Sequence, residues 1–243
     1  MKSPDYHITW LDAIDSTNSE AARHYATAAD LDVWVATFQE AGRGQQQNRW
    51  ESEANKNLLF SIFFRPSKLR AKKQFLLSQL VSLALCNSLQ EEGVKAVIKW
   101  PNDIYVGKKK IAGILIEHYI SGTHVLTSIA GIGLNVNQSV FHTAPNPTSL
   151  FLETNRLFEL PLLLQKILDN VKKYYLPINS KKLQEQYLSH LLFYKQWADY
   201  RSSEGILFKA QIVDVSSTGE LVLMDEVGDN HNFAFKEVFC INK

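Results

Sequence analysis

The sequence has little cysteine, almost no charge imbalance and no long apolar run. Cys86 and Cys240 are its only cysteines, and Cys86 lies in the helix-like run LLSQLVSLALCNSL, so we expect a buried free thiol and a reducing compartment. The 26 Lys and Arg residues nearly balance the 25 Asp and Glu residues, which argues against a nucleic-acid surface. FLLSQLVSLALC is too short to span a membrane, and MKSPDYHITW has no apolar export core. We therefore expect a cytoplasmic protein that binds neither DNA nor membrane.

Several common catalytic signatures are also missing. GRGQQQ from Gly42 and GIGLNV from Gly131 begin like a dinucleotide-binding fingerprint, but Gln47 and Val136 stand where its third glycine belongs. The chain contains no GxxxxGK[ST] phosphate loop and no GxSxG nucleophile elbow. Its seven histidines lack the spacing of zinc ligands. The sequence thus argues against dinucleotide, P-loop, serine-hydrolase and zinc chemistry.

The apolar pattern that is present predicts a chain of mixed helices and strands. Seven segments have the composition of strands and lie over 6–11, 32–38, 57–64, 94–100, 104–106, 110–119 and 124–137. Turns between the last four are too short for parallel crossovers, so these four strands should be antiparallel. Four segments have the apolar spacing or start signals of helices and lie over 17–29, 67–93, 155–175 and 180–192. The first begins with a T-x-x-E capping box at Thr17, and Ser67 caps the second.

The last forty or so residues change character. FKAQIVDV, GELVLMDE and NFAFKEVFCI alternate apolar and polar residues, with turn signals at 216–219 and 228–230. This pattern is typical of a small β-rich unit, and we expect an SH3-like barrel. We place the boundary at Trp197, with one domain over 1–196 and the small one over 197–243.

Two polar stretches near the start of the chain stand out. DSTN from Asp15 is typical of a helix start, and taken alone it predicts nothing more. QEAGRGQQQNRWE from Gln39 has two interpretations of about equal weight, an ordinary surface loop and a loop that binds a ligand. Its glycines permit close approach of the backbone to a ligand, and the Arg43 guanidinium suits a phosphate or carboxylate.

Two further polar stretches lie at strand ends. KWPND from Lys99 forms a tight turn, but a lysine and Asp103 flank that turn where binding and catalytic residues are common. In GKKKIAG from Gly107, Lys108 and Lys109 are most simply solvated turn residues. Lys110 differs because it begins the apolar strand IAGILIE, so we expect its side chain to point into a pocket.

In this order the stretches resemble the motifs of biotin protein ligases of the monofunctional type. The motifs S-T-N, Q-x-A-G-R-G…W, K-W-P-N-D, K-[LI]-[AG]-G-[IL]-L-x-E and G-[IL]-G-[IL]-N-x-N begin here at Ser16, Gln39, Lys99, Lys110 and Gly131. The match continues to Thr148-Ser149-Leu150. The resemblance implies an α+β fold, with a mixed β-sheet flanked by helices like that of class II aminoacyl-tRNA synthetases, and a C-terminal SH3-like β-barrel. Because S-T-N begins at Ser16, we expect no DNA-binding repressor domain ahead of it.

The resemblance also implies an activity, biotin–[biotin carboxyl-carrier protein] ligation. ATP and biotin would be the substrates, with Mg²⁺, and biotinyl-5′-AMP the intermediate. The partner would be the biotin carboxyl carrier domain of a biotin-dependent carboxylase, and a homodimer is possible through strand edges. By resemblance Lys110 lies between the biotin carboxylate and the α-phosphate, Arg43 contacts phosphate, and Asp103 either holds Mg²⁺ or orients the carrier lysine.

The implied binding residues fall into two sets. The biotin set is Ser16, Thr17, Asn18, Gln39, Gly42, Arg43, Gly44, Gln45, Trp50, Lys110 and Gly113. The ATP set is Arg43, Lys99, Asn102 and Asn135.

The sequence departs from the family motifs at one position, and two alternative functions remain open. Many relatives carry GRGRRGR, and Gln45 stands where an arginine helps them retain the adenylate, so we expect looser retention here. A lipoate or octanoate ligase shares this architecture but lacks this combination of motifs. A catalytically inactive biotin-binding module would not need the phosphate-site charges of Lys110, Arg43 and Asp103.

Overall fold

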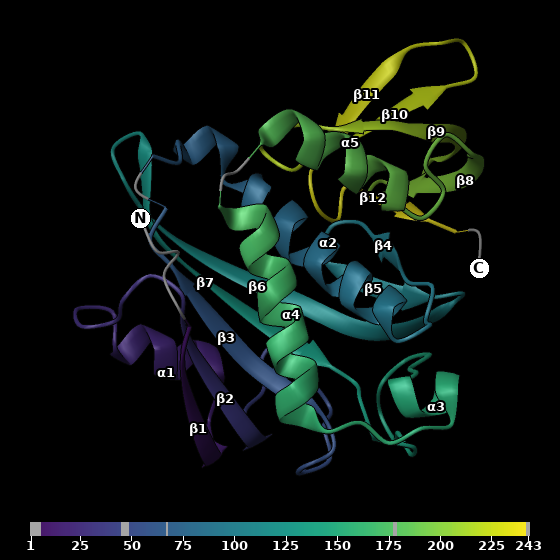
Figure 1. The fold of residues 1–243 in the computed structure, drawn as a ribbon. Helices are drawn as coiled ribbons and strands as arrows, with labels where there is room; N and C mark the ends of the chain where they lie inside the picture. Colours follow the sequence, from purple (N-terminus) through teal and green to yellow (C-terminus); the bar gives the residue numbers. More distant parts are fainter. Residues whose placement is uncertain (1–5, 45–48, 67, 177–178, 242–243) are drawn as a thin grey trace.

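The larger part of the molecule is a mixed β-sheet. The computed structural model describes residues 6–44, 49–66, 68–176 and 179–241 (Figure 1). Seven strands follow the order β1-β2-β3-β7-β6-β5-β4. They are β1 (His7–Ile14), β2 (Asp32–Gln39), β3 (Leu58–Phe64), β4 (Val97–Lys99), β5 (Asp103–Val106), β6 (Lys109–Ser121) and β7 (His124–Leu134). β1 and β2 are parallel and every other pair is antiparallel, which confirms the predicted mixed sheet.

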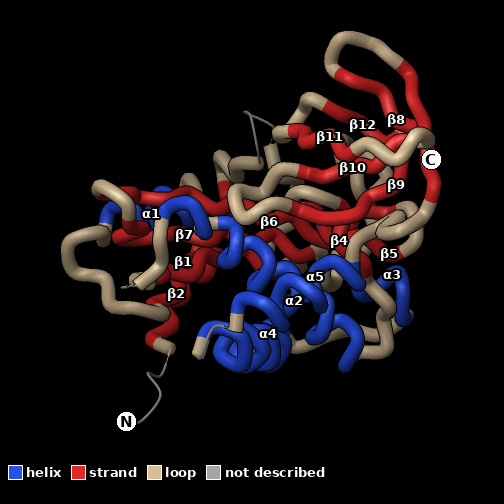
Figure 2. The backbone as a smooth tube through the Cα atoms, turned by 90° about the horizontal axis from the view of Figure 1, so that it is seen from above, coloured by secondary structure: helices blue, strands red, loops and turns tan. Residues whose placement is uncertain are grey.

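The helices cover the two faces of this sheet unequally. Three of them lie on one side, with α4 and α5 packed on α2, and a single helix lies on the other side (Figure 2). The three are α2 (Phe75–Glu91), α4 (Leu160–Tyr175) and α5 (Ser180–His190), and the single helix is α1 (Thr17–Arg23). The short α3 (Leu150–Thr154) follows β7 along the chain.

The central strand β3 shows how the sequence produces this arrangement. All seven of its side chains are buried, because both faces of the strand are covered. Phe60 and Ile62 join the main core with α2, whereas Phe63 points the other way and packs with Ala21 of α1. Ser61, two residues before Phe63, lies on the same face of the strand and also points toward α1. On that side α1 is the one helix among the described residues, and a pocket forms beside it.

The C-terminal segment forms a second, five-stranded antiparallel sheet in the order β11-β10-β9-β8-β12. Its strands are β8 (Trp197–Ser202), β9 (Leu207–Val215), β10 (Leu221–Asp225), β11 (Asn230–Phe233) and β12 (Val238–Cys240). This agrees with the predicted SH3-like unit, although among the described residues β11 and β12 remain edges and no closed barrel forms. Trp100 Nε1 donates to Gly219 O at 2.9 Å and joins the two sheets beside the KWPND turn.

The predicted start of the second helix is wrong. α2 begins at Phe75, after a 3₁₀ turn at Ala71–Lys73, and Ser67 lies outside the described residues. The intervening backbone is used elsewhere: Ala71 N donates to Thr123 O at 2.9 Å, and Val125 N donates to Leu69 O at 2.9 Å. These bonds hold the segment against the β6–β7 hairpin, and a helix over the same residues would break them.

The capping box predicted at Thr17 is also wrong. Ser16 is the N-cap, Thr17 is the first helical residue, and the helix ends at Arg23 rather than near residue 29. The Thr17 side chain turns instead toward Gln39 and Ser61, where it serves the site described below. Tertiary contacts therefore override the local capping signal at this position.

The helix predicted over 155–175 begins five residues later than expected, and the short α3 before it was not predicted. α3 ends at Thr154, and its C-cap Asn155 has a left-handed φ of 55° that stops the helix. α4 then begins at Leu160, with Pro161 in its first turn, where the missing N–H of proline costs nothing.

None of the helices in the described ranges has both the length and the apolar character that a membrane crossing requires.

Candidate functional site

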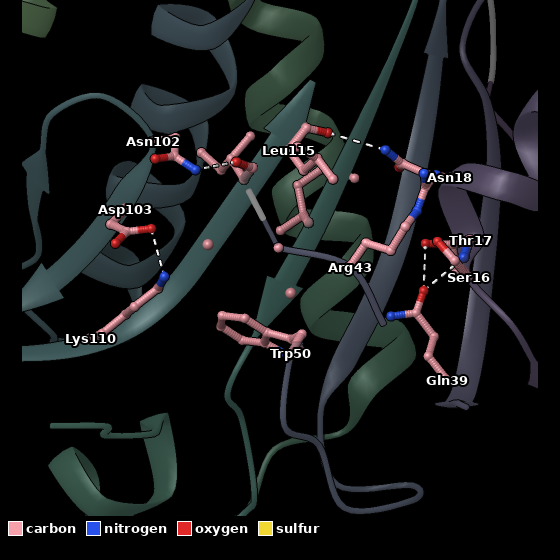
Figure 3. A pocket seen from close by; sticks show the side chains of 16 residues that line it. Ser16, Thr17, Asn18, Gln39, Arg43, Trp50, Asn102, Asp103, Lys110 and Leu115 are labelled. Carbon is pink, nitrogen blue, oxygen red and sulfur yellow. Dashed lines mark hydrogen bonds and ion pairs between the residues drawn. The ribbon is translucent and has the colours of Figure 1, made fainter. Parts of the chain in front are cut away.

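A pocket opens on the α1 side of the larger sheet, and it gathers most of the predicted site residues (Figure 3). Those that line it are Ser16, Thr17, Asn18, Gln39, Arg43, Gly44, Trp50, Asn102, Asp103, Lys110 and Gly113. They come from the start of α1, the end of β2, the glycine–arginine loop (residues 40–51), the KWPND turn and the strands β5 and β6. Stretches that are far apart in sequence thus converge on one cavity.

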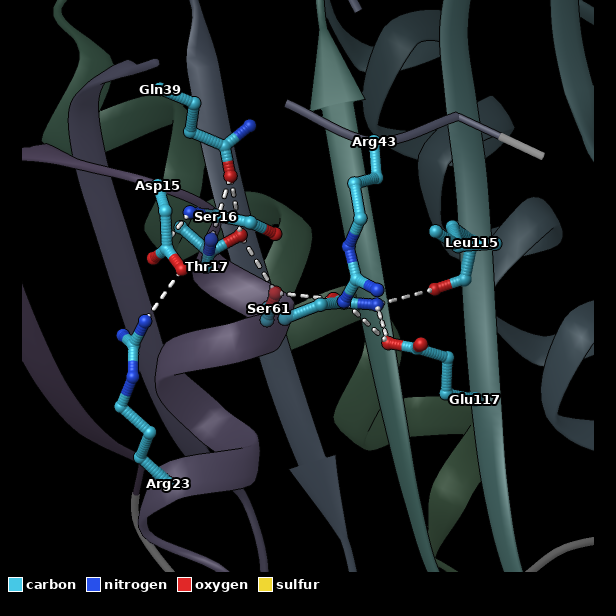
Figure 4. A network of polar contacts seen from close by, with 10 residues as sticks. Asp15, Ser16, Thr17, Arg23, Gln39, Arg43, Ser61, Leu115 and Glu117 are labelled. Atoms are coloured by element: carbon cyan, nitrogen blue, oxygen red, sulfur yellow. Dashed lines mark hydrogen bonds and ion pairs between the residues drawn. The ribbon is translucent and has the colours of Figure 1, made fainter. Parts of the chain in front are cut away.

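A hydrogen-bond network fixes the α1 end of the pocket (Figure 4). Thr17 N donates to Gln39 Oε1 at 2.7 Å. Ser61 Oγ donates to Asn18 Oδ1 at 2.6 Å and lies 2.7 Å from Thr17 Oγ1. Asn18 Nδ2 donates to Glu117 Oε2 at 2.7 Å. Because Gln39 Oε1 is engaged, its amide nitrogen is the group turned toward the pocket (Figure 3).

Ser16 brings a buried hydroxyl to the same end. As the N-cap of α1 its side chain is placed to bond the helix amides, but it makes no such bond. Ser16 N is instead bound by Asp15 Oδ1 at 2.8 Å. The hydroxyl of this residue, which is only 4% exposed, therefore remains available to a ligand.

Two glycines of β7 make room for the site. A Cβ atom at Gly131 would collide with the Asn18 amide, and one at Gly133 would lie 2.5 Å from Trp50 Cε2. A Cβ at Gly113 of β6 would lie 3.0 Å from Trp50 Cζ3. The glycines of the GIGLN motif are thus required for close side-chain packing on this face of the sheet.

The opposite end of the pocket carries the Lys110–Asp103 pair. Lys110 Nζ lies 2.7 Å from Asp103 Oδ1, and both side chains are about three-quarters buried. Lys110 Nζ also lies 5.4 Å from the centroid of the Trp50 ring, on which it makes a cation–π contact. Asn102 Nδ2 donates to Ile114 O at 2.6 Å and fixes the KWPND turn to β6. A partly desolvated positive charge, paired with Asp103, therefore faces the pocket where an anionic ligand could bind.

The glycine–arginine loop is closed at its base. Trp50 N donates to Gly42 O at 3.0 Å, and Arg43 and Arg49 form an isolated antiparallel bridge. Arg43 Nη2 donates to Glu117 Oε2 at 3.3 Å and points toward α1 rather than toward Lys110 (Figures 3 and 4). Gln45, on which the expectation of looser adenylate retention depends, lies outside the described residues.

Three predicted residues do not line the pocket. Gly42 lies behind it, where a Cβ would be 3.1 Å from Gln39 Nε2. Lys99 is exposed, and its Nζ lies 4.8 Å from the centroid of the Tyr105 ring. Asn135 is buried and its Nδ2 donates to Thr148 O at 2.9 Å, while its Oδ1 has no partner among the described residues.

The sequence also left some site residues unassigned. Ser61 and Glu117 belong to the network, and Ile114, Leu115, Gly131, Ile132 and Gly133 line the pocket. Ser61 did carry a signal, because it is the polar residue within the apolar strand LLFSIFF. Glu117 is the acid that ends KIAGILIE, a motif in which the family resemblance assigns only Lys110 and Gly113 to the site.

Among the described residues no group of three or more His, Cys, Asp or Glu side chains is placed to hold a metal ion. Asp103 is the carboxylate that lines the pocket. Mg²⁺ commonly takes one or two protein carboxylates and completes its shell with phosphates and water. The pocket thus fits an ion that arrives with a phosphate ligand, rather than one held by the protein alone.

Several known proteins are similar in sequence to the first part of this chain. The sequence model of the "Biotin/lipoate A/B protein ligase family" matches residues 10–137. "Bifunctional ligase/repressor BirA" of Bacillus subtilis strain 168 is 35% identical over 136 residues, which are 54% of this chain and 41% of that protein. "Biotin--[acetyl-CoA-carboxylase] ligase" of Paracoccus denitrificans is 37% identical over 128 residues, or 50% of this chain and 51% of that protein. The chain thus spans about half or less of the length of these relatives.

A solved structure extends the likeness over the whole chain. "Biotin protein ligase from Aquifex aeolicus in complex with biotin and ATP" has a TM-score of 0.78 and is 25% identical in sequence. The superposition covers 97% of this chain and 99% of the other, so it includes the second sheet as well as the first.

Proposed function

The chain belongs to the biotin/lipoate A/B protein ligase family, and from this premise we propose that it activates biotin with ATP and transfers the biotinyl group to a protein lysine. One observation carries the proposal. A single pocket has hydroxyl and amide groups at one end and the Lys110–Asp103 pair at the other. A ligand with an uncharged polar head and a carboxylate tail matches both ends.

The α1 end suits the cyclic urea of biotin, which has two N–H donors and one carbonyl acceptor. A buried urea needs a partner for each of these groups. The Gln39 amide nitrogen faces the pocket and would donate to the carbonyl, while the Ser16 hydroxyl would accept from an N–H. Trp50, packed on Gly133, would form the wall beside the apolar ring and tail.

The Lys110 end suits the activation step. A carboxylate oxygen of biotin attacks the α-phosphorus of ATP, the bond from that phosphorus to the bridging oxygen breaks, and pyrophosphate leaves. This step brings an anion toward a polyanion, so positive charge at the reacting phosphorus lowers the barrier. Lys110 Nζ would supply that charge by exchanging its contact with Asp103 for the substrate oxygens. Arg43 would contact phosphate after leaving Glu117, and Lys99, Asn102 and Asn135 would complete the nucleotide side.

Mg²⁺ would enter with the ATP phosphates, and Asp103 is the residue that would hold it. When bound, the ion neutralises phosphate charge and stabilises the leaving pyrophosphate. Asp103 is also the acid nearest Lys110, so after adenylate formation it would be free to orient an incoming amine.

In the transfer step a lysine amine of the acceptor attacks the acyl carbon of biotinyl-5′-AMP, the acyl–phosphate bond breaks, and AMP leaves. We propose a biotin carboxyl carrier domain as the acceptor. The support is that a relative carries the name "Biotin--[acetyl-CoA-carboxylase] ligase". The mixed anhydride hydrolyses in water, so the pocket would have to exclude water from the intermediate.

ATP–pyrophosphate exchange in the presence of Mg²⁺ tests the first half-reaction, with biotin, lipoate and octanoate in separate assays. Exchange that depends on biotin is the expected result. Exchange only with lipoate or octanoate would contradict the assignment of Ser16 and Gln39 to the biotin head while leaving the fold unaffected. Biotin binding without exchange with any acid would identify an inactive binding module instead.

A further inference from the structure

One carboxylate outside the predicted site joins two segments that border the pocket. Glu51 follows Trp50 at the end of the glycine–arginine loop. Its Oε1 accepts from His142 N at 2.6 Å, and its Oε2 accepts from Thr143 N at 2.8 Å and from Ala144 N at 2.7 Å. The Thr143 hydroxyl adds a fourth hydrogen bond, to Oε2 at 2.8 Å. Three consecutive backbone amides therefore enclose this one side chain.

The same segment, residues 142–148, holds the backbone of Lys110. Lys110 N donates to Asn146 O at 2.8 Å, and Thr148 N donates to Lys110 O at 2.9 Å. Thr148 O in turn accepts from Asn135 Nδ2 at 2.9 Å. Segment 142–148 is thus hydrogen-bonded to Glu51 at one end and to Lys110 and Asn135 at the other.

On its other side Glu51 is bonded directly to Trp50. The Trp50 ring has little freedom, because it lies on Gly133 and Gly113 with no space for a Cβ at the first of them. The Lys110 ammonium faces the ring at 5.4 Å from its centroid. Because Trp50 is held on the sheet, a shift of segment 142–148 would move the backbone of Lys110 and the partner of Asn135 while leaving the Trp50 ring in place.

We propose that Glu51 is a positioning residue that fixes segment 142–148 to the glycine–arginine loop and so sets the shape of the nucleotide side of the pocket. The inference rests on the proposed function, since it assigns Lys110 and Asn135 to ATP. The head-group end, formed by Ser16, Thr17 and Gln39, makes none of its described contacts with this segment.

Overall folding does not depend on this contact alone. Buried Gln138, four residues before the segment, forms a second connection to the chain just after the loop, because its Oε1 accepts from Glu53 N at 2.9 Å and from Asn57 Nδ2 at 2.5 Å. Loss of the Glu51 carboxylate should therefore loosen segment 142–148 without detaching it.

The carboxylate is ionised under physiological conditions. Partial burial by itself raises the pKa of Glu51, but the hydrogen bonds from His142, Thr143 and Ala144 together outweigh burial and lower the pKa to about 2. The anion is therefore the form that makes these contacts, and its neutral amide isostere is an informative substitution.

The test compares Glu51→Gln with Glu53→Gln. Glu53 is exposed two residues further along, and its carboxylate makes no contact among the described residues, so the control changes the charge equally. Glutamine at position 51 keeps one acceptor oxygen and turns an N–H toward backbone N–H groups. In the exchange assay we expect Glu51→Gln to raise the KM for ATP about tenfold, because the hydrogen bonds that it weakens hold the segment next to Lys110 and Asn135. The KM for biotin should stay within about twofold of wild type, because Ser16, Thr17 and Gln39 make none of their described contacts with that segment. Amide hydrogen exchange at residues 142–144 should also be faster in Glu51→Gln than in Glu53→Gln.

Two results would overturn the proposal. The first is that Glu51→Gln and Glu53→Gln have the same KM for ATP and that amide hydrogen exchange at residues 142–144 equals that of wild type in both. The other is a parallel rise in both KM values with a lower melting temperature, which would indicate a general structural role. If Glu51→Gln does not fold, Thr143→Val removes only the hydroxyl contact, and a rise of about two- to threefold in the KM for ATP is expected. Absence of biotin-dependent exchange in wild type would instead contradict the proposed function, while the amide-exchange comparison would still report on Glu51.

Discussion

Lys110 is the residue on which the proposed chemistry depends most. Its ammonium is 2.7 Å from Asp103 and faces the Trp50 ring, so a carboxylate or phosphate that enters the pocket meets a positive charge already in place. We expect Lys110→Ala to lower biotin-dependent exchange by about 10²- to 10³-fold, which is the usual effect of removing one electrostatic contact to a transition state.

The control for that substitution is the adjacent Lys109→Ala. Lys109 is exposed and its ion pair with Glu153 at 3.7 Å is of a kind that contributes little. Exchange by Lys109→Ala should equal that of wild type. Similar losses in the two variants would show that general positive charge on the hairpin, and not the position of Lys110, supports the reaction.

Gly133 gives a second test at the scale of one residue. A methyl group there would lie 2.5 Å from the Trp50 indole, so Gly133→Ala should displace the ring and raise the KM for biotin about tenfold or more. Gly122→Asn is the matched control, because Gly122 has a φ of 56° that asparagine tolerates and no neighbour within 4 Å of a Cβ. Normal biotin kinetics in Gly133→Ala would mean that Trp50 does not form the wall of the pocket.

Among the elements, Glu117 connects three that meet at the pocket. From β6 it accepts hydrogen bonds from Asn18 of α1 and from Arg43 of the loop. Glu117→Gln keeps an acceptor for Asn18 but loses the ion pair, whereas Glu117→Ala loses both. We expect the KM for biotin to rise about two- to threefold in the first variant and about tenfold in the second, since a bond to a buried amide is worth more than an exposed ion pair. Equal effects of the two substitutions would contradict this order.

The elements also show what local sequence can and cannot predict. Strands β2 to β7 follow from apolar composition, and the antiparallel order of β4 to β7 follows from the short turns between them. The pairing of β3 with β7 does not follow, because no short turn connects these two strands. The start of α2 does not follow, because residues 69–71 bond to the distant β6–β7 hairpin. Thr17 likewise carries a capping signal that its contacts with Gln39 and Ser61 override.

The candidate site was predicted mainly by resemblance, and the structure explains which parts local reasoning misses. Lys110 and Arg43 are unusual in their surroundings and can be singled out by chemistry alone. Gly131 and Gly133 cannot, because their purpose is visible only where Asn18 and Trp50 lie on them. Glu51 is missed for the same reason, since its partners are about ninety residues further along the chain.

At the scale of the whole molecule, the acid stability should depend on His118. Burial lowers the pKa of His118 from 6.5 to about 4, and its Nδ1 lies 2.7 Å from Ser128 Oγ. Between these two pH values the unfolded chain binds a proton that the native protein excludes, so stability is lost as the pH falls from 6.5 to about 4.

Thermal melting across that range would measure this dependence. We expect His118→Gln to flatten the loss of melting temperature between pH 6.5 and 4, and His142→Gln, at an exposed position, to keep the slope of wild type. A slope that is unchanged in His118→Gln would show that other groups govern acid stability.

Covalent transfer to a carrier is the central claim, and the most direct measurement of it is the intact mass of a purified biotin carboxyl carrier domain after incubation with this protein, ATP, Mg²⁺ and biotin. The account predicts a gain of one biotinyl group on one lysine, which requires ATP and is lost in Lys110→Ala. No gain on a domain that an established biotin ligase does modify, or a gain only when lipoate or octanoate replaces biotin, would contradict the account.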